Sequence, residues 1–297
     1  MEEILELRIN MDYAHLLFRE DEGKNLGDTV KLVRLASNDP RSAQVSKLYH
    51  KVLKVSNDLF FFGWKIIRQY TEKEFDNSSF YQFLIKKTFE PTGEDCGTIY
   101  DESTACEICG AHRTQVGDLK LRKSSLPKLD IARTIGGEII VSEKFVKLCQ
   151  TYKISGADFK NVYSSKNLLD YKQLVFSNGI DLSQKTKAGV NPFDYSTEPS
   201  EASTLKLDNG MEFDFPAEVY KCSLGHTIGL NLLTEAFVKD NPLIRSYDFL
   251  KSNQEIGVKR GYLIPEPIYF CSKKLREMII NEKLTGFNFE IAHIEES

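Results

Sequence analysis

The sequence has no apolar run long enough for a membrane span and no signal-peptide pattern. Its densest apolar stretch, LFFFGW at residues 59–64, is far shorter than the roughly 20 residues that a spanning helix needs. The opening MEEILELRIN places acidic residues where a secretory signal carries positive ones, and no apolar segment follows. We therefore expect a soluble, cytoplasmic protein that does not bind a membrane.

The sequence also lacks the common catalytic motifs. It contains no G-x-x-x-x-G-K-[ST], G-x-G-x-x-G, H-E-x-x-H or G-x-S-x-G pattern, so nothing indicates a nucleotide-binding loop, a zinc protease or a serine hydrolase. The acidic pairs Glu94/Asp95 and Asp101/Glu102 are candidates for catalytic carboxylates, although a solvated acidic loop accounts for them more simply. We expect no enzymatic activity.

Negative charge slightly exceeds positive charge, with 43 acidic residues against 39 lysines and arginines. The net charge is −4 and the isoelectric point is about 5.9, which argues against a large surface that follows a phosphate backbone. One short basic run, LKLRKSSLPK at residues 119–128, keeps a nucleic-acid-associated protein open as an alternative. That alternative predicts salt-sensitive binding that weakens when Lys120, Arg122 and Lys123 are neutralised.

Six cysteines are too few for a disulfide scaffold in a chain of 297 residues, and in a reducing compartment a C-x-x-C pair indicates metal binding or redox activity. The pair is Cys106 and Cys109, followed by a glycine that permits a tight turn. A structural zinc site needs four ligands, and KCSLGH offers Cys222 and His226. We predict a structural, closed zinc site at Cys106, Cys109, Cys222 and His226.

Two alternatives to this site stay open. A local set would use Cys96 and His112 in place of Cys222 and His226. The thiols could also bind no metal, although no helix start follows the C-x-x-C to lower a thiol pKa for redox work. The two remaining cysteines occupy apolar positions of predicted elements and are expected in the core: Cys149 and Cys271.

The first third of the chain has mixed helix and strand patterns. Leu5, Leu7 and Ile9 alternate as in a strand, and the apolar spacing after Pro40 predicts a helix. An aromatic run at residues 60–70 and the run 79–90 read as strands, with a short helix starting after Thr71 between them.

Residues 137–163 and 267–293 form an internal repeat. A constant offset of 130 residues aligns GEIIVSEKFVKLCQTYKISGADFKNVY with PIYFCSKKLREMIINEKLTGFNFEIAH without a gap. In each copy an apolar strand ends at a serine that caps a helix, the helix ends near a glycine, and a phenylalanine-containing strand follows. Each copy is therefore predicted to be a β-α-β unit. The segment KTKAGVNPFDYSTEPSEAST between them is predicted to be a loop.

These patterns predict an α+β fold. We expect an N-terminal α+β region at residues 1–92 and a second region at residues 93–297, in which the duplicated β-α-β units are stapled by the zinc knuckles. The long loop separates the two halves of the second region, so a metal that links both would hold them together.

CEICG, the later cysteine knuckle and the ending GFNFEIAHI together resemble the double-CXXCG motif proteins of bacteria, which are grouped with immunity proteins of toxin systems. The likeness runs from about Cys96 to the C-terminus. Cys106, Cys109 and Gly110 match the first motif. The second motif departs from the family pattern, because Gly225 stands where the family has its second cysteine.

The resemblance implies a non-enzymatic protein that neutralises a cognate toxin by binding it. An acidic surface suits a basic toxin because complementary charge steers association. A nucleic-acid-associated protein and an enzyme with an unrecognised active site remain the two other hypotheses.

Overall fold

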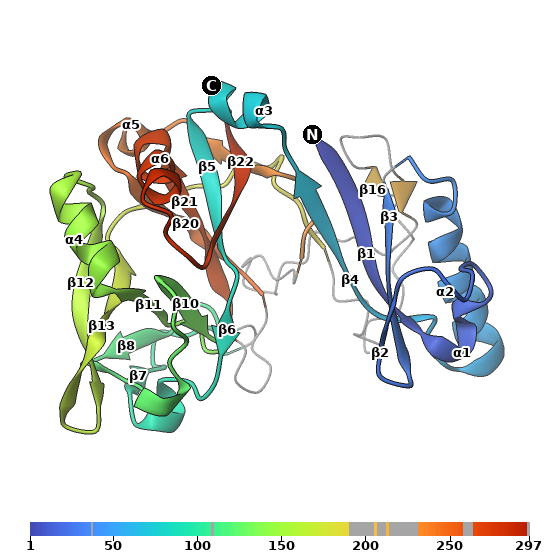
Figure 1. Cartoon of the computed structure of the whole chain (residues 1–297), viewed down its shortest axis with the longest axis horizontal. Coiled ribbons are helices and arrows are strands. Elements are labelled where there is room, and N and C mark those ends of the chain that lie inside the picture. Colours follow the sequence, from blue (N-terminus) through green and yellow to red (C-terminus); the bar gives the residue numbers. More distant parts are fainter. Residues whose placement is uncertain are drawn as a thin grey trace. The chain divides into compact units, whose positions relative to one another are not determined.

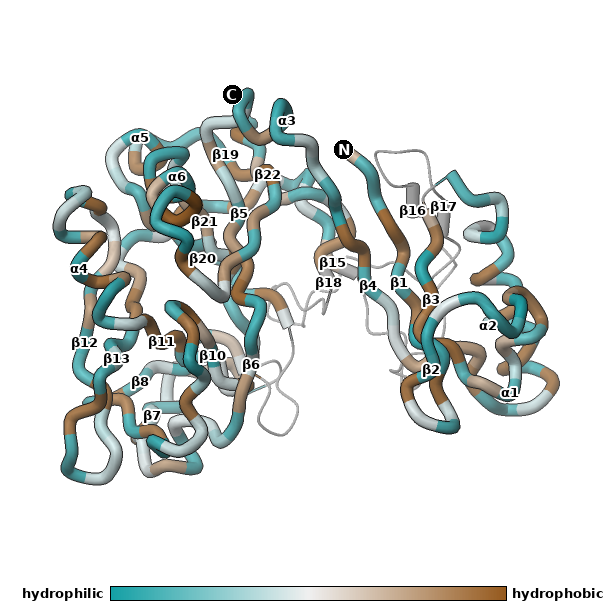
Figure 2. The backbone as a smooth tube through the Cα atoms, viewed as in Figure 1, coloured by the Kyte–Doolittle hydropathy of each residue, from teal (hydrophilic) through white to brown (hydrophobic). Residues whose placement is uncertain are grey.

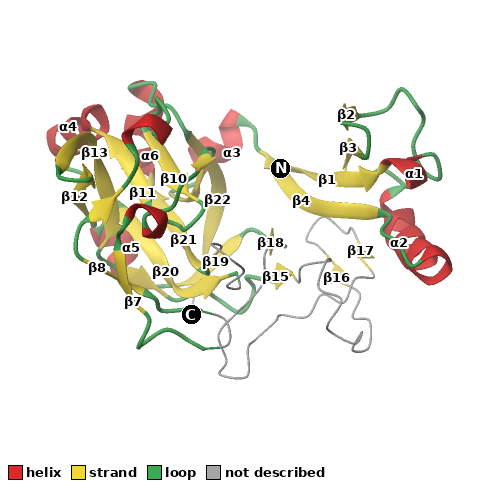
Figure 3. Cartoon of the chain, turned by 90° about the horizontal axis from the view of Figure 1, so that it is seen from below, coloured by secondary structure: helices red, strands yellow, loops and turns green. Residues whose placement is uncertain are grey.

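The structure is a computed structural model of the chain, and it describes residues 1–36, 38–107, 110–189, 205–206, 212–213, 231–257 and 264–295 (Figure 1). About 21% of the described residues are in helices and 43% in strands, and Figure 3 shows strands as the main regular structure. The predicted α+β class is confirmed. No described helix is long and apolar enough to cross a membrane.

The described residues fall into two compact units. The first holds residues 1–75 together with 187–189, 205–206, 212–213 and 231–234, and the second holds 76–186 and 235–295, each within the described ranges. The boundary predicted between residues 92 and 93 therefore lies inside the second unit. Residues 76–92 belong to the second unit because the strand Phe80–Ile85 hydrogen-bonds to strands near the C-terminus rather than to the N-terminal sheet.

The first unit is built on an antiparallel sheet of order β2-β3-β1-β4, and hydrophobic segments recur along β1 (Figure 2). Its elements are β1 Glu2–Asn10, α1 Met11–Ala14, β2 Lys24–Leu26, β3 Val30–Ala36, α2 Ser42–Ser56 and β4 Phe61–Gln69, with short pairs β15 Ala188–Gly189 with β18 Asn231–Leu232 and β16 Leu205–Lys206 with β17 Glu212–Phe213. The helix α3 Glu72–Asn77 spans the boundary between the two units.

The predicted N-terminal elements are confirmed. Leu5, Leu7 and Ile9 on β1 are buried in one core with Val45 and Val52 on the inner face of α2. Burying such side chains contributes roughly 1.5–3 kcal/mol each, so the fold depends on the same alternating and helical spacing that the sequence displays. The short helix α3 follows the expected capping threonine, whose Oγ1 accepts from the N–H of Glu74.

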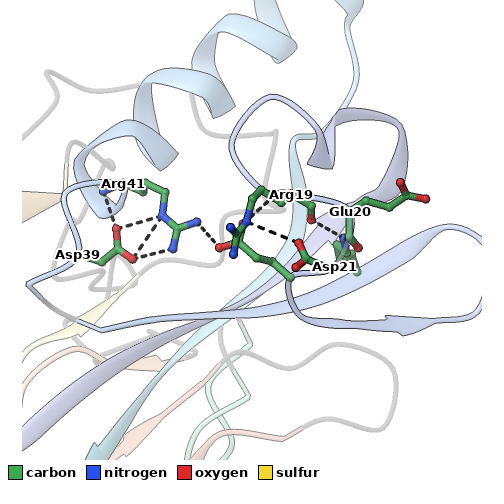
Figure 4. Close-up of polar contacts among 7 residues, drawn as sticks. Arg19, Glu20, Asp21, Asp39 and Arg41 are labelled. Atoms are coloured by element: carbon green, nitrogen blue, oxygen red, sulfur yellow. Dashed lines mark hydrogen bonds and ion pairs between the residues drawn. The ribbon is translucent and has the colours of Figure 1, made fainter.

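Charged side chains fix the loops of the first unit (Figure 4). Arg41 donates to the carboxylates of Asp39 and Glu22 across 2.8 and 2.7 Å. The Nζ of Lys31 donates to the main-chain oxygens of Arg19 and Glu20. These contacts tie the segment before α2 to the turn after α1.

The second unit contains two six-stranded sheets, of order β6-β10-β11-β13-β12-β9 and β14-β20-β21-β5-β22-β19 (Figure 1). Its first half has β5 Phe80–Ile85, β6 Thr88–Phe89, η1 Glu94–Cys96, β7 Ile99–Asp101, β8 Thr114–Val116, β9 Leu119–Lys120, η2 Lys123–Ser125, β10 Ile131–Thr134, β11 Ile139–Ser142, α4 Glu143–Thr151 and β12 Ala157–Ser164. Its second half has β13 Asn167–Phe176, β14 Gly179–Ile180, β19 Ala236–Lys239, α5 Leu243–Ser246, β20 Phe249–Ile256, β21 Glu266–Ser272, α6 Lys273–Asn281 and β22 Phe287–Glu295.

Both predicted repeat copies form a strand, a helix and a strand: β11-α4-β12 and β21-α6-β22. The Oγ of Ser142 accepts from the N–H of Phe145 across 3.1 Å, and the Oγ of Ser272 accepts from the N–H of Leu275 across 3.2 Å. The predicted capping serines are therefore confirmed. Each helix is followed by a left-handed lysine at φ 52° and then a glycine at φ 98°.

The correspondence extends beyond the predicted copies. β13 lies between β11 and β12, and β5 lies in the same place between β21 and β22. Gln173 of β13 pairs with Ile140 in β11, and Gln82 of β5 pairs with the corresponding residue Phe270 in β21. The two halves of the second unit thus exchange one strand. β5 begins the first half but lies in the sheet of the second half, and β13 begins the second half but lies in the sheet of the first half.

Two aspartates join the repeats reciprocally. Asp130, just before β10, accepts from the Oγ of Ser142 in its own repeat and from the N–H and Oγ1 of Thr285 in the other. Asp248, just before β20, accepts from Ser272 in its own repeat and from the N–H of Ser155 in the other. Each aspartate caps a turn of the opposite repeat, so the two halves stabilise each other.

Candidate functional site

Cys106, the first cysteine of the C-x-x-C motif, lies in the connection between β7 and β8 of the second unit. β7 and β8 pair antiparallel, with Ile99 opposite Val116. The N–H of Cys106 donates to the carbonyl oxygen of Ala111 and the N–H of Gly110 donates to that of Cys106, each across 2.8 Å. Gly110 has φ 77°, a conformation that favours glycine. These two bonds hold the main chain of Cys106 next to that of Gly110 and Ala111.

The structure places only one of the four predicted zinc ligands. Cys106 is buried, while Cys109, Cys222 and His226 lie outside the described residues. The positive φ of Gly110 is compatible with Cys106 as a thiolate ligand, because glycine permits the tight turns in which zinc-binding cysteines occur. The set of four remains a prediction.

The alternative ligands, Cys96 and His112, lie on different segments of the chain. Cys96 ends the short helix η1, and burial raises its thiol pKa against the opposing hydrogen bond from the backbone of Arg122. His112 is exposed, and its N–H donates to Glu255 across 2.9 Å. Within the described part of the chain, no three His, Cys, Asp or Glu side chains gather as metal ligands do.

A buried glutamate, Glu138, anchors the hairpin to the sheets. Its carboxylate accepts from the N–H of Gly93 across 3.0 Å and from the hydroxyls of Tyr100 and Thr134. Burial, together with the neighbouring Glu138 charge, raises the pKa of Tyr100, so the phenol stays neutral and donates. The root of β7 is thereby held in one position.

Arg113 fixes the other side of the hairpin. Its guanidinium lies 3.8 Å from the centre of the Tyr100 ring and pairs with Glu94 and Glu102 across 2.6 and 3.1 Å. Its side chain is only 8% exposed. The stacking on Tyr100 and the hydrogen bond from Nη2 to Glu94 restrict the position of the guanidinium, while Glu102 contributes an ion pair to Nε.

Gln115 completes the anchoring, because its amide exchanges hydrogen bonds of 3.1 and 2.6 Å with Gln173 of β13. Tyr100, Arg113 and Gln115 form one wall of a pocket of about 240 Å³, and Glu255 and Glu266 line it from β20 and β21. These two carboxylates are engaged, by the N–H of His112 and by Arg133 respectively. The contacts of Gln115 with Gln173 and of His112 with Glu255 therefore hold the hairpin against β13 and β20.

The opposite face of the hairpin is exposed and apolar at its centre. Ile99 and Val116 are cross-strand partners that are 66% and 50% exposed. Most single exposed apolar side chains need no explanation, but a directly paired set on a rigid hairpin offers a contiguous contact. This pair is the strongest candidate for a binding surface in the described second unit.

Exposed acidic residues are frequent in the chain segment that contains the apolar pair. Six acidic residues between positions 94 and 118 are exposed: Glu94, Asp95, Asp101, Glu102, Glu107 and Asp118. Asp101, Glu107 and Asp118 form no ion pair with any described residue. Hydrogen bonds from the side chain and N–H of Ser103 hold the pKa of Asp101 below its usual value, so this carboxylate stays charged. Ile99, Val116 and the six carboxylates are called the hairpin surface below.

The C-x-x-C-G spacing indicates a turn at Cys106, whereas no sequence pattern indicates the residues that anchor the hairpin, Glu138 and Arg113. Glu94 and Asp101, two of the candidate catalytic carboxylates, have different partners: Glu94 pairs with Arg113, and Asp101 accepts from the main-chain N–H of Ser103. Glu138 and Arg113 carry no local spacing signal, because Gly93 and Tyr100, which Glu138 contacts, and Glu94, which Arg113 contacts, are distant in the chain. No protein-family model matches the chain, and no curated protein sequence matches it either.

Proposed function

We propose that this protein is a cytoplasmic, non-enzymatic immunity protein that binds and neutralises a cognate toxin through the hairpin surface. The observation that supports the proposal is the exposed Ile99–Val116 pair on a hairpin that Glu138 and Arg113 hold in place, within a chain segment rich in exposed carboxylates. A preformed apolar centre with a charged rim is how protein-binding surfaces gain affinity.

The charge of the rim specifies the partner's chemistry. Three carboxylates without ion pairs to described residues favour a basic toxin, because complementary charges raise the association rate and reject acidic proteins. Removing the central apolar side chains is expected to raise the dissociation rate, since such contacts dominate hot spots. Rim mutations should act mainly on association and on its salt dependence.

A structural zinc ion at Cys106, Cys109, Cys222 and His226 is part of the proposal. The turn closed by the Cys106 N–H and Gly110 supports it. With four protein ligands the metal would leave no open position for water. It would stabilise the loop that carries Glu107 and so preorganise the hairpin surface.

The test compares three tagged forms of the full chain in pull-downs from native lysate: the wild type, Ile99→Asp/Val116→Asp, and Leu168→Asp. Leu168 is 54% exposed on β13 and serves as the matched control. We expect one stoichiometric basic protein with the wild type and the control, and at least about a hundredfold weaker binding by the double variant.

The captured protein is then expressed alone and with each form. Toxicity that the wild type and Leu168→Asp relieve, and that the double variant does not, is the expected outcome. A partner that the double variant binds unchanged would refute the role of the hairpin surface. Nucleic acid in place of a protein would favour the second hypothesis, and substrate turnover would favour an enzyme.

A further inference from the structure

A second pocket lies in the same unit, at the end of the β12–β13 hairpin. Its volume is about 530 Å³, it is open to solvent, and it is lined by three segments distant in sequence: Asp95 and Cys96 of η1, residues 120–122 at the end of β9, and the turn of residues 164–166. None of its lining residues belongs to the pocket under the β7–β8 hairpin.

Three of the eight residues that line this pocket are cationic. Lys120, Arg122 and Lys166 all line it, and none of them forms an ion pair or side-chain hydrogen bond with a described residue. Three cations gathered within one pocket repel one another unless an anion lies between them. The chain as a whole has a net charge of −4, so the composition does not indicate this local concentration of positive charge.

Only one carboxylate opposes them among the lining residues. Asp95 also lines the pocket, but its Oδ2 accepts from the N–H and Oγ1 of Thr92 across 3.0 and 2.8 Å. These bonds direct the charge of Asp95 toward the backbone of the preceding turn. The net charge of the lining is therefore two positive charges.

Hydroxyl donors lie beside the cations. Ser164 pairs with Asn167 across the β12–β13 hairpin, and Ser165 in the two-residue turn has φ 58°. A turn of this kind has a fixed shape, because both of its ends are held in the strand ladder. Ser164 and Ser165 thus offer two O–H groups on a rigid support next to Lys166.

The remaining polar atom in the wall is uncharged. Burial raises the pKa of Cys96 above its usual value, so its thiol is neutral at physiological pH and does not repel an anion. The lining contains no aromatic side chain, so a nucleic-acid base would find nothing on which to stack.

We infer that this pocket binds the phosphate group of a small phosphorylated molecule, with Lys120, Arg122 and Lys166 as its cations and Ser164 and Ser165 as hydroxyl donors. A phosphomonoester carries close to two negative charges and three acceptor oxygens at neutral pH, which matches the two net positive charges. Arginine can bind phosphate through two parallel N–H bonds. The volume leaves room for an attached group beyond the phosphate.

The test is calorimetric titration of the full chain with inorganic phosphate and with a nucleoside monophosphate, at constant ionic strength set by chloride. The unphosphorylated nucleoside and an oligothymidylate are the comparison ligands. We expect both phosphates to bind at one site per chain and the nucleoside not to bind. Tighter binding of the oligothymidylate than of the monophosphate would overturn the inference and point to nucleic acid.

Variants locate the binding. Arg122→Gln and Lys166→Gln should each weaken phosphate binding roughly tenfold, since each removes a charge-assisted hydrogen bond. Lys160→Gln is the matched control, because Lys160 lies on β12, outside the pocket lining. Equal affinities of Lys160→Gln and Arg122→Gln would show a general charge effect and overturn the assignment.

Two further variants test the site without large charge loss or refolding risk. Ser165→Gly places glycine at a left-handed position that favours it, so the fold should persist while phosphate affinity falls several-fold. Asp95→Asn should tighten binding, because it removes the one opposing charge. Unchanged affinity in both variants would overturn the proposed geometry.

Discussion

The two glycines that follow α4 and α6 allow a direct test of the repeated architecture. Gly156 and Gly286 both have φ 98°, a backbone conformation that other residues adopt only under strain. A Cβ on Gly156 would lie well under 3.0 Å from the carbonyl oxygen of Phe249, and one on Gly286 equally close to that of Ile131. Both obstacles are main-chain atoms of sheet strands, which cannot rotate away.

The expected cost follows from these two contributions. A non-glycine residue in this conformation costs about 1–3 kcal/mol, and forcing atoms into a packed site adds about 1–3 kcal/mol. Gly156→Ala and Gly286→Ala should therefore each lower the free energy of unfolding by roughly 2–6 kcal/mol. That is a large part of the roughly 5–15 kcal/mol typical of a folded protein.

Gly117→Ala is the matched control, because Gly117 has φ 88° in the same unit and no described neighbouring atom within 4 Å of its Cβ position. It should cost only the conformational part. Urea unfolding followed by circular dichroism, compared at an unchanged m value, measures all three variants. If Gly156→Ala is no more destabilising than Gly117→Ala, the steric argument is wrong. If Gly156→Ala and Gly286→Ala differ by several kcal/mol, the two sites are not equivalent.

Asp130→Asn should remove an acid-sensitive part of the stability. Burial raises the pKa of Asp130, but hydrogen bonds, led by those from Thr285, lower it more, so the folded pKa lies below the usual value of the carboxyl. The stabilisation is therefore present above the unfolded pKa and is lost as pH falls through the folded pKa. Urea unfolding at a series of acidic pH values should show a shallower decline in the variant, and an identical decline would contradict this. Cys106→Ser should release about one zinc ion per chain and destabilise the protein strongly; elemental analysis that finds full zinc occupancy would rule out Cys106 as a ligand. Cys149 and Cys271 should resist iodoacetamide in the native protein, because burial raises the pKa of Cys149 to about 12 and that of Cys271 far above its usual value; rapid labelling of either, detected by mass spectrometry, would contradict their burial.

The internal repeat shows how far local patterns reach. The constant offset aligns β11-α4-β12 with β21-α6-β22 because neither copy contains an insertion. It fails before Gly137, where the connections differ in length between the repeats. Long surface insertions cost little free energy, so they accumulate and break the alignment.

The swapped strands β5 and β13 leave a weak trace in the sequence. QFLI at residues 82–85 and QLVF at residues 173–176 share a glutamine followed by apolar residues. So short a match carries no weight by itself. Gln82 and Gln173 are equivalent only in the folded chain, where their strands lie between corresponding partners in the two sheets.

The sequence by itself determined the elements whose cause is local: the buried face of β1 and α2, the serine caps of α4 and α6, the glycines after them, the buried cysteines and the closed turn at Cys106. Backbone conformation, capping and periodic burial act over a few residues, so they leave readable patterns. Tertiary structure alone decided the exchange of β5 and β13, the anchoring of the hairpin by Glu138 and Arg113, and the gathering of Lys120, Arg122 and Lys166. Those contacts join segments tens of residues apart, and a single sequence has no spacing rule for groups that only the folded chain brings together.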